Sequence, residues 1–236
     1  MNTVIRVVFA FVLLLSSAVG RVFAQQSTTV IFHTCLNKQR LAPMNYAHGL
    51  NPFDSIRIDN LRFYIGGVSF EKKDGFLLYE DRKPQLVDTY DTVRNRLILK
   101  GLSSSDGGRL CVQLGLDSIQ NTIGIQSGEL DPVMGMYWTW QSGFIHFKLE
   151  GEAIDSVGNQ LKFQYHLGGY RTPFAVTQKV CIDLKSLKDT LHIAVELNNV
   201  LTSELLLRQP KLMSPGPDAV RIFGRIADSF QVMPNP

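Results

Sequence analysis

The chain has 236 residues, of which 44% are hydrophobic, 10% aromatic and 19% charged. It carries 24 lysines and arginines against 21 acidic residues, a formal net charge of +3. Because nucleic acids and anionic membranes are bound through clusters of positive charge, this balance gives no electrostatic reason to expect either partner.

The N-terminal segment has the order of residues that is typical of a secretory signal peptide. Arg6 precedes an apolar run over residues 7–20, and Arg21 separates this run from the small residue Ala24. We expect cleavage after Ala24, which predicts a periplasmic or secreted protein made of residues 25–236. An uncleaved anchor is the alternative, but the run is short for a membrane span, and no later segment is apolar enough for an integral span.

Alternation of apolar and polar residues with a period of two dominates the rest of the chain and predicts half-buried strands. The predicted strands cover residues 28–35, 55–72, 76–80, 96–102, 109–116, 143–154, 160–168, 174–184 and 190–197. Short turns separate most of them. The expected fold class is therefore all-β, a single antiparallel β-sandwich domain over residues 25–236 rather than a set of parallel βαβ units.

The clearest helical pattern is at the C-terminus, over residues 217–230. Val220, Phe223 and Ile226 recur at helical spacing, and Asp218 falls in the first turn, where the helix dipole favours an acid. We therefore expect one short helix after the last strand of the sandwich.

The chain has three cysteines, Cys35, Cys111 and Cys181, which allow at most one intramolecular disulfide. Cys111 and Cys181 both fall in predicted strands. They are either a cross-strand disulfide or two buried small hydrophobic residues, and the sequence does not decide between these. No CxxC motif is present.

Signatures of catalysis are absent from the sequence. There is no HExxH motif, no GxSxG motif and no glycine-rich phosphate loop. We therefore expect a binding protein rather than an enzyme, with a hydrolase built from scattered residues as a remote alternative.

The five histidines differ in their expected environments. His33 shares a strand face with Ile31 and Cys35, which indicates burial or a recessed site, whereas His48 is expected in a loop. Strand alternation places the other three on polar faces, where a solvated imidazole is the simplest interpretation. These are His146, His166 and His192.

Both tryptophans of the chain, Trp138 and Trp140, are one residue apart and close to Met134 and Met136. In an extended segment the two indoles share one face, about 7 Å apart. One interpretation is packing in the core or at its rim. A second is a soft metal site with histidines, since imidazole suits copper. A third is an exposed platform with Tyr137 that stacks on a carbohydrate or peptide.

Five segments resemble, in this order, the MbnP-like family of periplasmic or secreted β-rich proteins, which is named for its place beside methanobactin copper-uptake genes. They are NLRFYIGGVSF, PQLVDTYD, LCVQLGLD, GELDPVMGMYWTWQSGFIHFKLEG and FQYHLGGY. The resemblance extends from about residue 28 to the C-terminal helix. Its most specific part is the run DPxxGMYWxWQSG.

The resemblance implies Cu(I) held by two histidines and a kynurenine, which is made from a tryptophan with the help of a di-haem peroxidase-like partner. Carried onto this chain, the metal-site residues are His33, His166, Trp138 and Trp140, with Trp138 favoured for oxidation. His146 has no counterpart among the family ligands. The function expected is copper acquisition, storage or handover, with a metal-free interaction module as the alternative.

Overall fold

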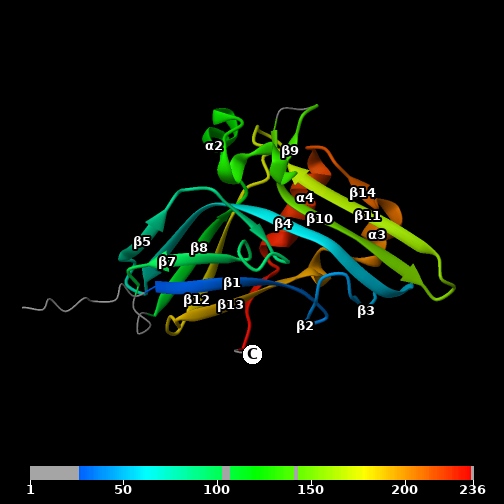
Figure 1. The fold of residues 1–236 in the computed structure, drawn as a ribbon, viewed down its shortest axis with the longest axis horizontal. Coiled ribbons are helices and arrows are strands. Elements are labelled where there is room, and N and C mark those ends of the chain that lie inside the picture. The colour runs from blue at the N-terminus through cyan, green and yellow to red at the C-terminus, as the bar shows by residue number, and fades with distance from the viewer. Residues whose placement is uncertain (1–26, 103–106, 141–142, 235–236) are drawn as a thin grey trace, which may run out of the picture.

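The computed structural model shows two β-sheets packed against each other, with helices at the margins of the sandwich (Figure 1). The predicted signal peptide, residues 1–24, lies outside the described residues. The structure describes residues 27–102, 107–140 and 143–234.

The smaller sheet has five described strands. They are β1 (Ser27–Leu36), β2 (Gln39–Arg40), β7 (Arg96–Lys100), β13 (Thr190–Glu196) and β15 (Phe230–Val232). β1 is central: it pairs in parallel with β13 and antiparallel with β2 and β7. This sheet therefore joins the beginning of the domain to its end.

The larger sheet has ten described strands and is organised by β4, which is 20 residues long. β4 pairs with β10 along its first half and with β8 along its second. The strands are β3 (Tyr46–His48), β4 (Phe53–Lys72), β5 (Leu77–Asp81), β6 (Gln85–Asp88), β8 (Gly108–Leu114), β9 (Tyr137–Trp138), β10 (Gly143–Asp155), β11 (Gln160–Gly168), β12 (Gln178–Leu184) and β14 (Lys211–Leu212).

The all-β sandwich with a short C-terminal helix is confirmed, but the sheets are mixed rather than purely antiparallel. β1 pairs with β13 in parallel over seven residue pairs, and β11 pairs with β14 in parallel. Alternation gives the same period in both kinds of pair, so it indicates strands without indicating the direction of their partners.

The helices are short. They are α2 (Ser118–Ile123), α3 (Ser203–Arg208) and α4 (Pro217–Ala227), and the described residues also include three single 3-10 turns, Gly128–Leu130, Pro132–Met134 and Leu197–Asn199. α4 ends three residues before the predicted end because Phe230 begins β15 instead. Within the described ranges, no helix is long and apolar enough to cross a membrane.

The core is formed by both sheets together. Phe32 of β1 meets Phe63 of β4 edge to face at 5.5 Å between ring centroids, and Phe63 stacks on Phe147 of β10 at 5.9 Å. A second, smaller cluster lies beside the β9 end of the larger sheet. Its buried members are Tyr64, Leu86, Leu116, Leu130, Met136, Trp138, Phe144 and Ile145.

Cys111 of β8 and Cys181 of β12 are directly opposite in the antiparallel pairing and form a disulfide. This resolves the two interpretations left by the sequence in favour of the cross-strand bond. Cys35 is a free thiol, and its side chain is buried. Burial raises the pKa of the Cys35 thiol to about 11, so it stays protonated at neutral pH.

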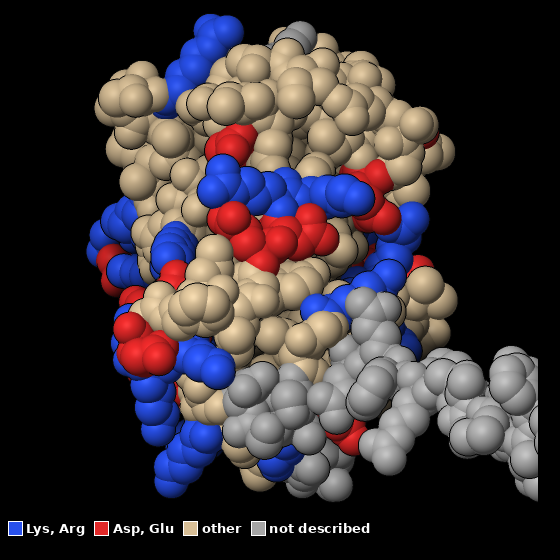
Figure 2. Space-filling model, turned by 90° about the vertical axis from the view of Figure 1, so that its left-hand side faces the viewer, with Lys and Arg blue, Asp and Glu red and all other residues tan. Residues whose placement is uncertain are grey.

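Acidic and basic side chains lie next to one another on the face drawn in Figure 2, without a large region of one sign. Opposite charges also pair at the surface of the described residues, for example Arg109 with Asp183 at 2.8 Å. The arrangement agrees with the near-neutral net charge of the sequence, and this face has no positively charged region that would bind a polyanion.

Removing the disulfide should lower the stability of the domain markedly. The bond closes a loop of 70 residues in the unfolded chain, which corresponds to roughly 4 kcal/mol of stabilisation in the chain-entropy model. The double variant Cys111→Ala/Cys181→Ala should therefore unfold at a much lower urea concentration than the oxidised parent. A Cys35→Ala variant should retain the dependence of its unfolding midpoint on added reductant; loss of that dependence would contradict the assignment of the bond.

Candidate metal centre

The two tryptophans occupy a hairpin rather than one extended strand. Trp138 of β9 pairs with Gly143 of β10, and the chain reverses between them. Trp138 is only 4% exposed, whereas Trp140 is 63% exposed in the turn. Their ring centroids are 5.7 Å apart with planes tilted by 43°. The expected arrangement on one strand face is therefore wrong, and the pair instead joins a buried indole to an exposed one.

The buried indole lies against β11, directly over Gly168. A Cβ atom added to Gly168 would come within 2.8 Å of Cζ3 of Trp138, so only glycine permits this contact. His166 is two residues before Gly168 and therefore on the same face of β11, about 7 Å along the strand. The hairpin thus brings Trp138 next to the strand segment that carries His166.

The indole nitrogen of Trp138 has no hydrogen-bond partner among the described residues, although it is buried. Leaving a buried donor unsatisfied costs about 1–3 kcal/mol, which packing alone does not require. A cavity of about 270 Å³ adjoins the ring and is lined also by Tyr170, Phe174 and Pro215. Trp138 therefore borders a cavity that a small molecule can enter, and its buried N–H group is left without a hydrogen bond.

His166 is held by Glu150. Its Nε2–H donates to Oε1 of Glu150 at 2.7 Å, which leaves Nδ1 with its lone pair. The hydrogen bond from His166 is the main cause that holds the pKa of the Glu150 carboxyl below its ordinary value, and Lys148 lies 3.8 Å away. A carboxylate in this position fixes the tautomer and the orientation of the ring, as it does behind metal-bound histidines.

The interpretation of His166 as a solvated histidine is wrong, since the residue is buried between its neighbours on the sheet. Lys148 of β10 is its partner in the register, and β14 pairs along the other edge of β11. Alternation failed here because it assigns a residue to one face of the sheet without indicating how far neighbouring side chains cover that face.

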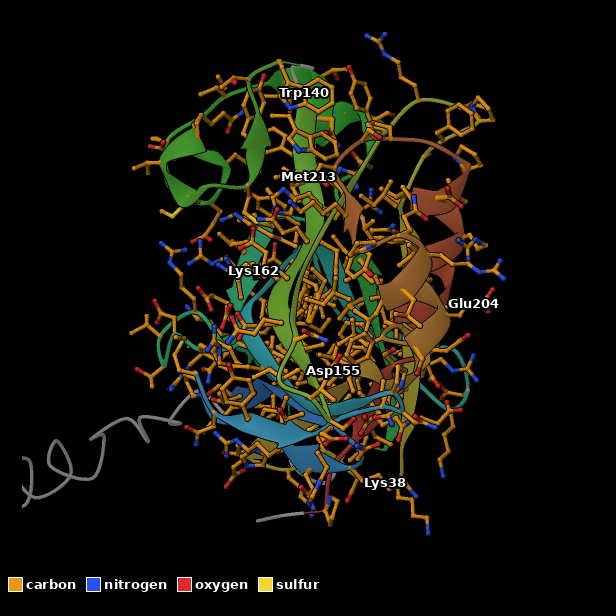
Figure 3. The ribbon with its side chains drawn as sticks, turned by 90° about the vertical axis from the view of Figure 1, so that its right-hand side faces the viewer. Lys38, Trp140, Asp155, Lys162, Glu204 and Met213 are labelled. Atoms are coloured by element: carbon orange, nitrogen blue, oxygen red, sulfur yellow. A yellow bond between two sulfur atoms is a disulfide. The ribbon has the colours of Figure 1, made fainter. Side chains whose placement is uncertain are left out.

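Met213 is a third candidate donor at this place, one that the sequence patterns did not indicate. β14 ends at Leu212, which pairs with Tyr165 of β11 in parallel, and Met213 follows directly in the chain. Figure 3 shows Met213 and Trp140 at the same end of the molecule. A thioether is a soft ligand of the kind that Cu(I) accepts.

His33 is not brought to this place. Its Nε2 lies 2.8 Å from Nδ1 of His192, in the smaller sheet. Phe32 and Leu167 both point into the shared core, so their neighbours His33 and His166 point away from it, each from its own sheet. One ion cannot contact both imidazoles in this arrangement. The ligand roles of His33, His166, Trp138 and Trp140 themselves remain predictions.

His146 is fully buried, and its prediction as a solvated residue is wrong. The β10–β11 register shifts between Ile145 and Phe147, so His146 is the extra residue of a bulge and leaves the alternation. Its Nδ1–H donates to the Val176 carbonyl at 3.0 Å, and its Nε2 accepts from the Asn121 amide at 3.0 Å. Both ring nitrogens are thus occupied, which agrees with leaving His146 out of the ligand set.

The remaining sequence expectations concern the surface. His48 is exposed at the end of β3 rather than in a loop, and His192 is half-buried. Tyr137 is half-buried and Trp138 buried, so the described hairpin does not present three exposed rings for stacking.

Across the described ranges, three or more His, Cys, Asp or Glu side chains do not gather into a group that could hold a metal ion. A metal at this centre would therefore need at least one donor other than His, Cys, Asp or Glu. The arrangement supplies an imidazole nitrogen, a thioether sulfur and an indole that becomes a donor only after oxidation, and these are soft or borderline groups.

Comparison with known proteins decides the family. The family model described as MbnP matches residues 25–214, most of the chain. The chain belongs to the MbnP family. The structure of MbnP from Methylosinus trichosporium aligns with 75% of this chain and 77% of that chain, at a TM-score of 0.49 and 13% sequence identity. A search of curated proteins gave no match.

In this MbnP-family chain, the residues that the sequence predicts for the metal site are divided between the two sheets. Trp138 lies over the segment of β11 that carries His166, Trp140 lies beside Trp138, and His33 lies in the smaller sheet. The sequence patterns did not indicate Glu150, which alternates with Lys148 on the polar face of β10. They did not indicate Met213 either, since only the tertiary structure pairs the preceding residue, Leu212, with Tyr165.

Adding a methyl group at Gly168 should displace the buried indole. The new Cβ of Gly168→Ala would also come within 2.4 Å of the Phe144 carbonyl oxygen, so backbone and ring must both shift. We expect lower stability and a red-shifted, more quenchable tryptophan fluorescence. Gly143→Ala is the matched control, because its nearest contact is an ordinary 3.9 Å to Tyr170. Unchanged emission in Gly168→Ala would show that Trp138 does not pack there.

His146 should make the domain less stable in mild acid. Burial is the main cause that lowers its pKa from 6.5 to about 4, so the unfolded chain takes up a proton that the folded chain refuses. This contribution is fully present above pH 6.5 and is lost as the pH falls towards 4, about 3 kcal/mol in all. Urea midpoints measured across this window should fall less steeply for His146→Gln than for the parent. An equal slope in both would refute the assignment, and exposed His48→Gln serves as the control.

Proposed function

We propose that this MbnP-family protein binds Cu(I) outside the cytoplasm for acquisition, storage or handover, and is not an enzyme. The observation that carries the proposal is the contact of Trp138 with Gly168, which sets an oxidisable indole next to a carboxylate-oriented His166. The family places the protein among methanobactin-associated proteins, and the donor chemistry of this place suits a soft monovalent ion.

The available donors fit a copper ion of low charge. Nδ1 of His166 is the free imidazole nitrogen, since Nε2 is engaged by Glu150. Met213, which directly follows the β14 residues that pair with β11, would add a thioether. Glu150 itself also accepts from Asn60 at 3.1 Å, so it is satisfied as an orienting group rather than needed as a ligand.

We further propose that Trp138 is oxidised to kynurenine by a di-haem peroxidase-like partner. Oxidation would replace an unpartnered buried N–H by an aniline nitrogen and a ketone oxygen, both donors. Trp140 lies beside Trp138 and is exposed, so an oxidant outside the protein has an aromatic route to the buried ring. His33, on the other sheet, is not part of this centre.

Periplasmic or secreted location is proposed from two features. The N-terminal segment has the pattern of a signal peptide, and the cross-strand disulfide is of the kind that persists in oxidising compartments. The same compartment is where an exchangeable copper ion is encountered before uptake.

The test is a Cu(I) titration of the protein from residue 25 onward against a chromophoric chelator, with ascorbate rather than thiol as reductant. His166→Ala should abolish binding at this centre. Glu150→Gln should weaken it by roughly 10- to 100-fold, since it removes the group that orients the ligand. Intact mass reports whether Trp138 has been converted to kynurenine, and the titration is repeated on protein produced with and without the oxidising partner.

Matched controls separate this centre from general imidazole binding. His48→Ala removes one exposed histidine. Lys162→Ala removes an exposed side chain from the same face of β11 as His166. Neither change should alter the affinity for Cu(I). Equal affinity in the parent and His166→Ala, with Trp138 oxidised, would overturn the proposal. Binding of a carbohydrate or peptide by the parent that is lost in Trp140→Ala would instead favour the metal-free interaction module.

A further inference from the structure

The contact between His33 and His192 follows from the parallel register of β1 and β13. Phe32 pairs with Ile193, and both side chains enter the core. The residues flanking this pair therefore share the outer face of the smaller sheet, where the two imidazoles meet. Nε2 of His33 and Nδ1 of His192 are 2.8 Å apart, and the ring planes lie within 17° of each other.

We propose that His33 and His192 form a second Cu(I) site, separate from the one at Trp138 and His166. Two nitrogen donors that face each other in nearly parallel rings match an ion that accepts two ligands in a line. Bonds of about 2 Å to each nitrogen need a separation of about 4 Å, so the rings must part by roughly 1 Å. His192 is only half-buried, which leaves its ring room to move.

Besides the separation of the rings, binding needs a rearrangement of protons within the pair. One ring now donates its N–H to the lone pair of the other. For both lone pairs to face the ion, the donating ring moves that proton to its second nitrogen, so the proton stays on the protein.

The surroundings select a monovalent ion over a divalent one. Zn²⁺ in proteins requires four ligands as a rule, and the described part of the chain gathers no third His, Cys, Asp or Glu at this place. Arg40 is close enough to act on both rings, and its positive charge opposes a divalent ion more than a monovalent one.

The pair does not depend on the centre at Trp138. Lys38, at the turn that joins β1 to β2, and Trp140 lie at opposite ends of the molecule in Figure 3. No tryptophan has to be oxidised to complete a pair of imidazoles. The two sites should therefore bind Cu(I) under different conditions. The first needs His166 and the modified indole, and the second needs only His33 and His192.

The test uses purified protein whose tryptophans are shown by mass to be unmodified, in the His166→Ala/Trp138→Phe background that removes the first centre. We expect this protein to bind one Cu(I), and the further change His192→Asn to reduce the bound copper to none. X-ray absorption at the copper edge should show two nitrogen neighbours. Absence of Cu(I) binding in the background protein, or binding that survives His192→Asn, would overturn the proposal.

Two controls complete the design. Cys35→Ala removes the nearby free thiol, itself a soft ligand; loss of binding in that variant would overturn the two-histidine site. His48→Asn removes an exposed histidine and should leave one Cu(I) bound. Thermal unfolding checks that each variant is folded, and His192 is chosen for substitution because it is less buried than His33, which is 4% exposed.

Discussion

β4 carries the hydrogen bonds on which both ends of the larger sheet depend. Its first half pairs with β10 and its second half with β8, while β3, β5 and β6 occupy its other edge. Because one strand serves both halves, β10–β11 and β8–β12 separate where the β4 pairing changes from one to the other, near Ile65. The space at this separation is filled by His146, which bridges to the segment at Val176 and to α2 through Asn121.

The bulge that buries His146 also sets the position of the tryptophan hairpin. β10 begins at Gly143, and its first residues pair with β9 on one side while Ile145 pairs with Gly168 of β11 on the other. Trp138 consequently lies across the start of β10 and reaches Gly168. The glycine is needed because no side chain fits between the indole and the strand. Packing, pairing and the candidate metal centre are thus consequences of one local geometry.

The two proposed copper sites differ in how their donors are held. At His166 the ring is fixed by Glu150, and the proposed third donor would come from chemical modification of Trp138. At His33 and His192 the proposed donors are two rings, of which His192 is half-buried. The first arrangement would favour retention of a bound ion, and the second would favour its exchange.

The sequence by itself determined the nine longer strands, the C-terminal helix and the aromatic-rich segment, because alternation, helical spacing and composition are local properties; the six strands of two to four residues were not predicted. It did not determine that β1 pairs in parallel with β13, that Cys111 meets Cys181, or that His33 faces His192 instead of His166. It also predicted solvent for His146 and His166, since alternation assigns a face but not what covers it. Only the tertiary structure decided these contacts, because they join strands far apart in the sequence, 70 residues for the two cysteines and 159 for the two histidines, or depend on a single inserted residue in a strand.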